Sequence, residues 1–125
     1  MQLTPPMQRP LKKSVLVASR EPKLTDVRKH LVEDAGFRVF PARTIRQVEK
    51  ECKENDIHLV LVGYSVPPAK KRRMFMAARK HCKTPILELF STGEPELVQQ
   101  SHTYAHHAEE PGDFLEAVRS ILKSA

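Results

Sequence analysis

The sequence predicts an α/β fold in which helices cover both faces of a parallel sheet. Three observations predict it. Strand-length apolar runs alternate with helical patterns, and the connections between them are short. A third is the run HLVLVG, residues 58–63, which is apolar at nearly every position, as a strand covered on both faces requires. We divide the chain into a flexible, proline-containing arm, residues 1–12, and one domain, residues 13–125.

The first strand and helix are predicted from the sequence KSVLVAS and the helical pattern after it. This β-branched run, Lys13 to Ser19, has the length of a strand. Pro22 suits the first turn of a helix, where its missing N–H costs nothing, and Gly36 is a typical helix stop. The positions at helical spacing that we expect to face the core are Leu24, Val27, Leu31 and Val32.

The same alternation continues through the middle of the chain. FRVFPA, residues 37–42, is a short strand, and Thr44 is a plausible N-cap for a helix over residues 45–55. HLVLVG is the third strand, and residues 69–82 have helical propensity. In that helix we expect Met74 to fill the core and Met76 to lie at the surface.

The last third predicts two more strands and two more helices. PILELF, residues 85–90, is the fourth strand, residues 94–101 form a short helix, and residues 102–108 form a weaker fifth strand. The final helix has the clearest amphipathic stripe, at Phe114, Leu115, Val118, Ile121 and Leu122. Five strands alternating with five helices favour the flavodoxin-like strand order 2-1-3-4-5, with the functional crevice beyond the carboxyl ends of the strands.

Composition limits the partners and the compartment. The net charge of +6 and the pI near 9.6 permit contact with nucleic acid or acidic proteins, but the absence of Trp disfavours a base-stacking surface. No apolar run is long enough to span a membrane. Cys52 and Cys82 have no metal-binding or redox spacing, so we expect two small apolar core residues in a reducing, cytoplasmic setting.

Five stretches of the chain match a known family in order and spacing. They are VLVASREP, GFRVFPA, HLVLVGYSVP, TPILELFS and EEPGDFLEAVRSIL. From Lys13 to Leu122 the sequence resembles the receiver domain of bacterial two-component response regulators, the phosphorelay family. The resemblance implies two acidic residues after the first strand and an aspartate after the third, which together bind Mg²⁺. It implies that this aspartate accepts a phosphoryl group, and that a threonine or serine and a lysine hold it.

At each of these positions the chain departs from the family pattern. The six positions that correspond to the family's phosphorylation site are Ser19, Arg20, Glu21, Gly63, Phe90 and Glu110. Gly63 has no carboxylate, so no acyl phosphate can form there, and Glu21 alone is too little for a Mg²⁺ site. Arg20 would lie near the missing metal and pair with Glu21 or Glu110. Tyr64 and Ser65 have hydroxyl groups but no base to activate them.

We therefore expect a pseudo-receiver without enzymatic activity, metal or cofactor, which signals through protein–protein interaction. By resemblance, its partner or homodimer face runs from Glu94 to Lys123, and His107 occupies the family's aromatic switch position. His102 and His106 have metal-like spacing, but on a strand they do not converge with His107.

An alternative function remains open. It is nucleic-acid or polyanion binding through the basic run Lys70, Lys71, Arg72 and Arg73.

Overall fold

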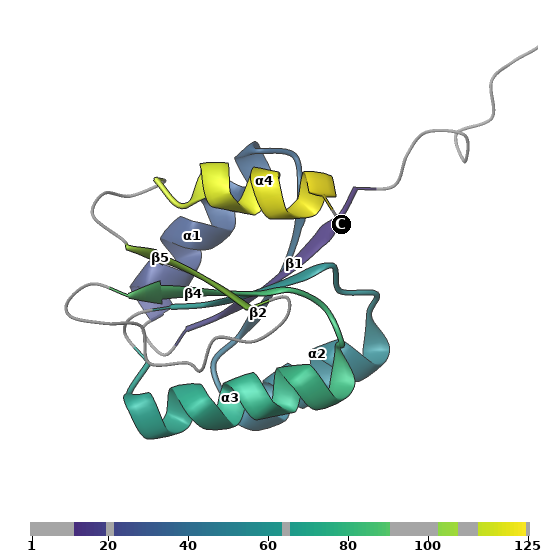
Figure 1. Ribbon diagram of the computed structural model, residues 1–125, viewed down its shortest axis with the longest axis vertical. Helices are drawn as coiled ribbons and strands as arrows, with labels where there is room; N and C mark the ends of the chain where they lie inside the picture. The colour runs from purple at the N-terminus through teal and green to yellow at the C-terminus, as the bar shows by residue number, and fades with distance from the viewer. Residues whose placement is uncertain (1–11, 20–21, 64–65, 91–102, 108–112, 125) are drawn as a thin grey trace, which may run out of the picture.

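A computed structural model describes residues 12–19, 22–63, 66–90, 103–107 and 113–124 (Figure 1). Over these ranges the elements are β1 (Ser14–Ala18), α1 (Pro22–Asp34), β2 (Arg38–Ala42), α2 (Ile45–Glu54), β3 (Leu59–Val62), α3 (Pro68–His81), β4 (Ile86–Phe90), β5 (Thr103–His107) and α4 (Leu115–Ser124). The short helix expected over residues 94–101 and residues 1–11 of the arm lie outside the described residues.

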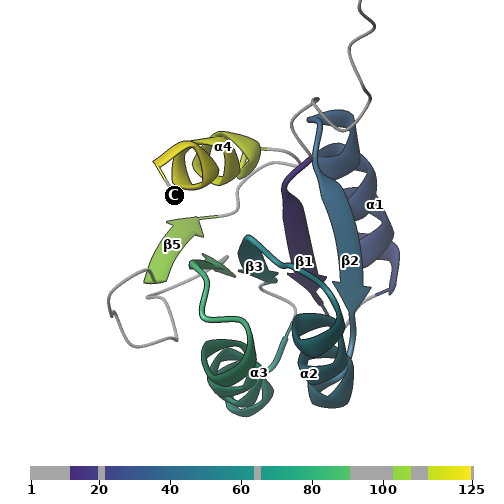
Figure 2. The same cartoon turned by 90° about the vertical axis from the view of Figure 1, so that its right-hand side faces the viewer.

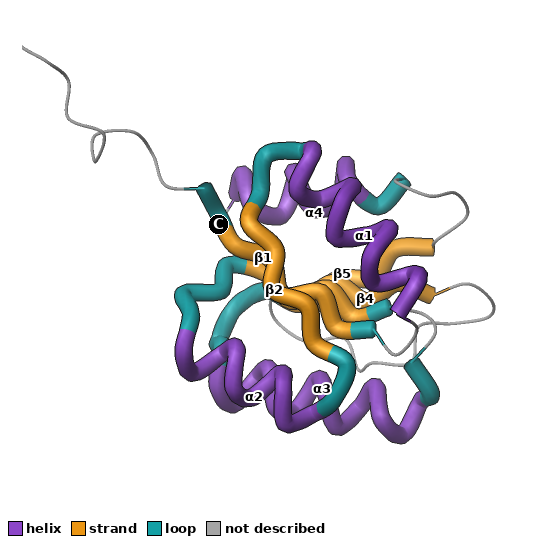
Figure 3. The backbone as a smooth tube through the Cα atoms, turned by 180° about the vertical axis from the view of Figure 1, so that it is seen from behind, coloured by secondary structure: helices purple, strands orange, loops and turns teal. Residues whose placement is uncertain are grey.

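The five strands form one parallel sheet in the order β2-β1-β3-β4-β5, which confirms the expected fold and strand order. Helices α1 and α4 cover one face and α2 and α3 the other (Figures 2 and 3). The carboxyl ends of all five strands consequently meet at one edge, where the loops into the helices begin.

Alternate residues of the central strands build two separate cores. Leu16, Val60 and Ile86 face α2 and α3, whereas Val15 and Leu59 belong to the core beneath α1 and α4. Both sets are almost fully buried, because this sheet is covered on both sides. The parity of a residue number therefore assigns its side chain to a face: in β1, β3 and β4, even-numbered residues face α2 and α3, and odd-numbered residues face α1 and α4.

Local signals place α2 and the methionines of α3 as expected. The Thr44 hydroxyl accepts from the backbone N–H of Gln47, and the Gln47 side chain accepts from the Thr44 N–H, which completes a capping box. Met74 is fully buried and Met76 is exposed.

One expectation for α1 is wrong. Val27 is 47% exposed, whereas Arg28, a residue that we did not place in the core, is only 5% exposed. Arg28 lies four residues before the buried Val32 and therefore shares its face, while Val27 is turned about 100° away.

The expectation for the cysteines is also wrong. Cys52 of α2 and Cys82, at the end of α3, form a disulfide with Cα atoms 4.9 Å apart. Their separation of 30 residues matches no local motif, and the pairing arises because the fold places the ends of the two helices side by side. The pair removes the cysteine-based argument for a reducing compartment.

Among the helices of the described ranges, none is both long and apolar enough to cross a membrane.

Candidate functional site at the carboxyl edge of the sheet

Three of the sequence-predicted positions are brought together where β1, β3 and β4 end. Ser19 is fully buried, and its N–H donates to the Ala42 carbonyl at 3.0 Å. The Gly63 N–H donates to the Ala18 carbonyl at 2.9 Å, which fixes the loop after β3 against β1. Phe90 ends β4. Arg20, Glu21, Tyr64, Ser65 and Glu110 lie outside the described residues, and so does the ion pair expected of Arg20.

Arg28 occupies the space in front of Gly63. By strand parity, a side chain at position 63 would point toward α1, as Leu61 does. A Cβ built on Gly63 would overlap Arg28 Nη1 and lie 3.2 Å from Arg28 Cζ. The guanidinium thus takes the volume that an acceptor side chain would need, and it places positive charge there.

Arg28 is the functional residue that sequence reasoning missed. The available signal was its helical spacing from Val32, which puts an arginine on a face that is otherwise buried. The sequence predicts a fixed cation at this edge from Arg20, after β1, whereas Arg28 comes from the middle of α1.

Lys71 and Glu88 form a buried ion pair on the opposite face of the sheet. Lys71 Nζ of α3 lies 3.0 Å from Glu88 Oε2 of β4, and the two side chains are 3% and 0% exposed. Glu88 has the same parity as Ile86 and therefore faces α3. Lys71 is consequently not available to a polyanion at the surface, which corrects its place in the expected basic run.

Phe90 and His107 contact each other across β4 and β5. They are register partners, and their rings meet edge to face with centroids 5.3 Å apart and planes at 62°. By resemblance, Phe90 occupies the position of the threonine that holds the phosphoryl group in the family, and His107 occupies the family's switch position. A hydrophobic ring therefore fills the first, and an exposed imidazole lies against it.

His106 is the other histidine of this segment that lies in the described residues, and it faces an acid. His106 Nε2 lies 3.6 Å from Asp113 Oδ1, which precedes α4. His102 lies outside the described residues, and within the described ranges no three metal-ligating side chains converge.

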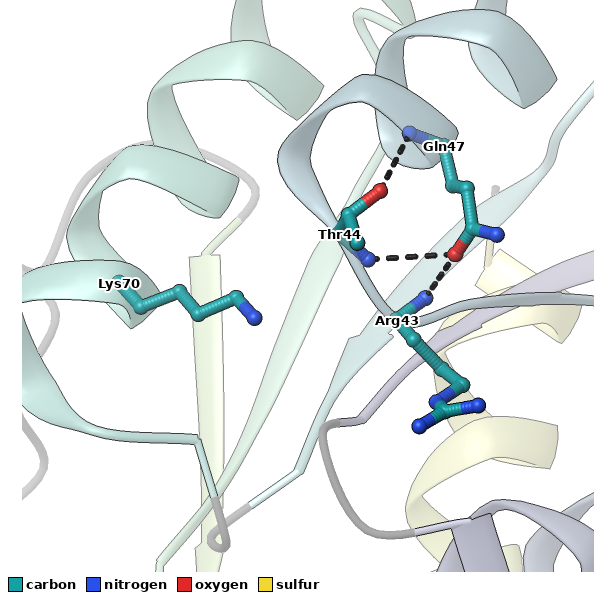
Figure 4. Close-up of a pocket in the computed structure, with 4 residues that line it drawn as sticks. All are labelled: Arg43, Thr44, Gln47 and Lys70. Atoms are coloured by element: carbon teal, nitrogen blue, oxygen red, sulfur yellow. Dashed lines mark hydrogen bonds between the residues drawn. The ribbon is translucent and has the colours of Figure 1, made fainter.

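Beside this edge, a basic pocket of about 420 Å³ lies between the first turns of α2 and α3 (Figure 4). It is lined by Arg43, Thr44, Gln47 and Lys70. Gln47 Oε1 accepts from the Arg43 N–H at 2.6 Å and from the Thr44 N–H at 3.2 Å. The capping box therefore uses these backbone donors, and the pocket's positive charge comes from the Arg43 and Lys70 side chains.

Lys70 is half-buried, and Arg72 and Arg73 are exposed. These three residues of the basic run are at the surface.

No protein-family model and no curated protein matches the sequence. Several solved structures match its fold. Chemotaxis protein CheY4 of Vibrio cholerae is 19% identical with a TM-score of 0.74, covering 89% of this chain and 99% of its own. The CheY-like receiver domain protein of Methanospirillum hungatei is 18% identical with a TM-score of 0.74, covering 91% of this chain and 96% of its own.

A third solved structure has a similar extent of match. The signal receiver domain of an HD domain-containing protein from Pseudomonas fluorescens is 12% identical with a TM-score of 0.75, covering 91% of this chain and 97% of its own. With these likenesses over nearly the whole length of each domain, the chain has the CheY-like fold of response-regulator receiver domains.

Proposed function

We propose that this protein is a receiver-type signalling module that works by binding another protein and does not accept a phosphoryl group. The observation that carries the proposal is Gly63, at the family's acceptor position, with the buried Arg28 guanidinium packed against it. A cation from the same chain thus takes the space that an acceptor carboxylate would need.

The chemistry of phosphoryl transfer supports the same proposal. A transferring phosphoryl group needs a nucleophile, and the Mg²⁺ that neutralises it needs several oxygen ligands. Gly63 supplies no nucleophile, and Glu88, the buried carboxylate of β4, is paired with Lys71. We therefore propose a non-enzymatic role without a resident metal or cofactor.

By the same resemblance, the partner face is the family's usual one, residues 94–123. Its described part contains a hollow of about 220 Å³ between β5 and α4, lined by Leu87, Tyr104, Ala105, Ala117, Ser120 and Ile121. Tyr104 is 42% exposed on the edge strand β5. A large, partly exposed aromatic residue beside an apolar hollow suits a protein interface, including one with a second copy of the chain.

The phosphoryl-independent state is tested by NMR with beryllofluoride and Mg²⁺, which together imitate an acyl phosphate. We expect the backbone amide resonances of Gly63 and Ser19 to stay unchanged, because the reagent finds no carboxylate. Vibrio cholerae CheY4 serves as a positive control for the reagent if it responds. Localised shifts around Gly63 would contradict the proposal.

The partner face is tested by replacing Tyr104 with a photo-crosslinking amino acid in cells. Met76, which is 67% exposed on α3, is the matched control on the other side of the sheet. We expect a defined protein adduct, or a dimer of the chain, from position 104 and not from position 76. The same adducts from both positions would remove the assignment.

A further inference from the structure

Helix α3 has a charge pattern that the receiver-like function does not use. It contains six lysines and arginines over Pro68–His81 and no acidic residue. Lys71 is neutralised inside the core by Glu88, which leaves five cations on the rest of the helix. By contrast, the lysines and arginines of α2 alternate with glutamates.

The fold places the cations of α3 beside a cation from another part of the chain. Helices α2 and α3 run side by side in the same direction: their first turns share the basic pocket, and their last turns are joined by the Cys52–Cys82 disulfide (Figures 1 and 4). Arg43 and Lys70 therefore lie at the same edge, and Arg73 follows Lys70 by one helical turn. We call Arg43, Lys70 and Arg73 the basic face.

The basic face is electrostatically unfavourable for the protein alone. Neither α2 nor α3 has an acidic residue in its first turn, where a carboxylate would be favoured, and cations there oppose the helix dipoles. The three glutamates of α2 come later, and two of them have other contacts: Glu49 Oε2 lies 3.8 Å from His81 Nε2, and Glu51 Oε1 accepts from Asn55. An external anion would relieve this arrangement.

The lining of the pocket favours nucleic acid over an acidic protein. Two of the four lining residues are cations, and none of the four is acidic. Nucleic-acid interfaces are more polar and more positively charged than protein–protein interfaces. On α3, Lys70 and Arg73 lie one helical turn apart, a spacing that suits successive backbone phosphates better than a single anion.

We propose that the basic face binds the phosphodiester backbone of nucleic acid without reading its sequence, as a second activity beside protein binding. Three neutralised phosphates give a slope of log affinity against log salt of about −2.7. The chain has no Trp for base stacking, which fits contact with the backbone alone.

The experiment measures fluorescence anisotropy of a labelled duplex of arbitrary sequence with the full chain at about 50 mM and about 150 mM salt. The variant is Arg43→Ala/Lys70→Ala/Arg73→Ala. The control, Lys50→Ala/Lys53→Ala/Lys80→Ala, removes the same net charge from exposed residues outside the first turns of the same helices. Lys71 is kept in both, because its removal would leave Glu88 buried without its partner.

We expect the wild-type protein to bind at low salt, the basic-face variant to bind about tenfold or more weakly, and the control to stay within about threefold of wild type. No binding at low salt would overturn the proposal. Equal losses in both variants would also overturn it, since net charge would then explain the binding. Displacement of the duplex by polyglutamate at equal charge concentration would reassign the face to an acidic protein and so reject nucleic acid.

Discussion

Arg28 and Gly63 are fitted to each other at the carboxyl edge of the sheet. Any side chain at position 63 must displace the Arg28 guanidinium, which is 5% exposed and held beneath α1. The contact that disfavours a side chain at position 63 therefore comes from the flexible end of an arginine on another element.

We expect Gly63→Ala to lower the free energy of unfolding by about 1 kcal/mol, the low end for overpacking, because the added Cβ must push aside only the flexible end of Arg28. In an Arg28→Ala background the same substitution should cost much less, since the overlapping atoms are gone. Chemical denaturation of the four proteins in this double-mutant cycle measures the coupling. Additive effects would show that the two residues do not share this space.

Lys71 and Glu88 are a second pair whose members depend on each other. Each is buried, and removal of one partner leaves the other's charge in the core. We expect Lys71→Ala to destabilise the fold by about 3–5 kcal/mol, and the double replacement Lys71→Met/Glu88→Leu to recover most of that loss.

The neighbouring Lys70→Ala is the control for this prediction, because Lys70 lies at the surface pocket and should change stability by about 0.5 kcal/mol or less. Denaturant titration measures the free energy of unfolding of each variant, and an unchanged slope of that free energy against denaturant concentration shows that the variants are comparable. If Lys71→Ala and Lys70→Ala were equally mild, the ion pair would not be a buried one in solution.

At the scale of elements, the disulfide holds the last turns of α2 and α3 together. It closes a loop of about 30 residues that contains β3 and all of α3. In the chain-entropy account, such a cross-link stabilises the fold by restricting the unfolded chain, by roughly 3–4 kcal/mol.

We expect a reducing agent to lower the melting temperature of the wild-type protein and to leave a Cys52→Ser/Cys82→Ser variant unaffected. Thiol labelling of the unreduced, denatured protein should find no free cysteine, because both are paired. Quantitative labelling of two thiols in protein purified without reductant would contradict the pairing.

At the scale of the whole molecule, the two proposed interfaces lie on opposite faces of the sheet. The hollow at Tyr104 is between β5 and α4, and the basic face is on α3 and the loop after β2, on the other side of the sheet (Figure 2). A partner on one side therefore leaves the other accessible, and the two activities should be separable.

We expect Tyr104→Glu to abolish protein crosslinking from a probe placed elsewhere on β5 or α4, while it leaves duplex binding within about threefold of wild type. The basic-face variant should do the reverse. Crosslinking yield and anisotropy, measured on both variants, check this independence. Loss of both activities in either variant would indicate one shared surface or a folding defect, and circular dichroism separates those two causes.

The sequence by itself determined the class of fold, the strand order and most of the element boundaries. Periodicity of two or 3.6 residues and the cap at Thr44 are local signals, and the ladder of β2, β1, β3, β4 and β5 results from them through the rules of parallel sheets. The missing carboxylate at position 63 also follows from the sequence alone, because it is a property of one residue.

Only the tertiary structure decided which residues meet. The guanidinium of Arg28 at Gly63, the pairing of Lys71 with Glu88, and the Cys52–Cys82 disulfide each join elements whose contact no local spacing specifies. Local periodicity places a side chain on a face, but whether a charge there is buried depends on which partner another element brings to it. For that reason Lys71 lies in the core and not with the surface cations of the basic run, whereas Arg43, from the loop after β2, lines the same pocket as Lys70.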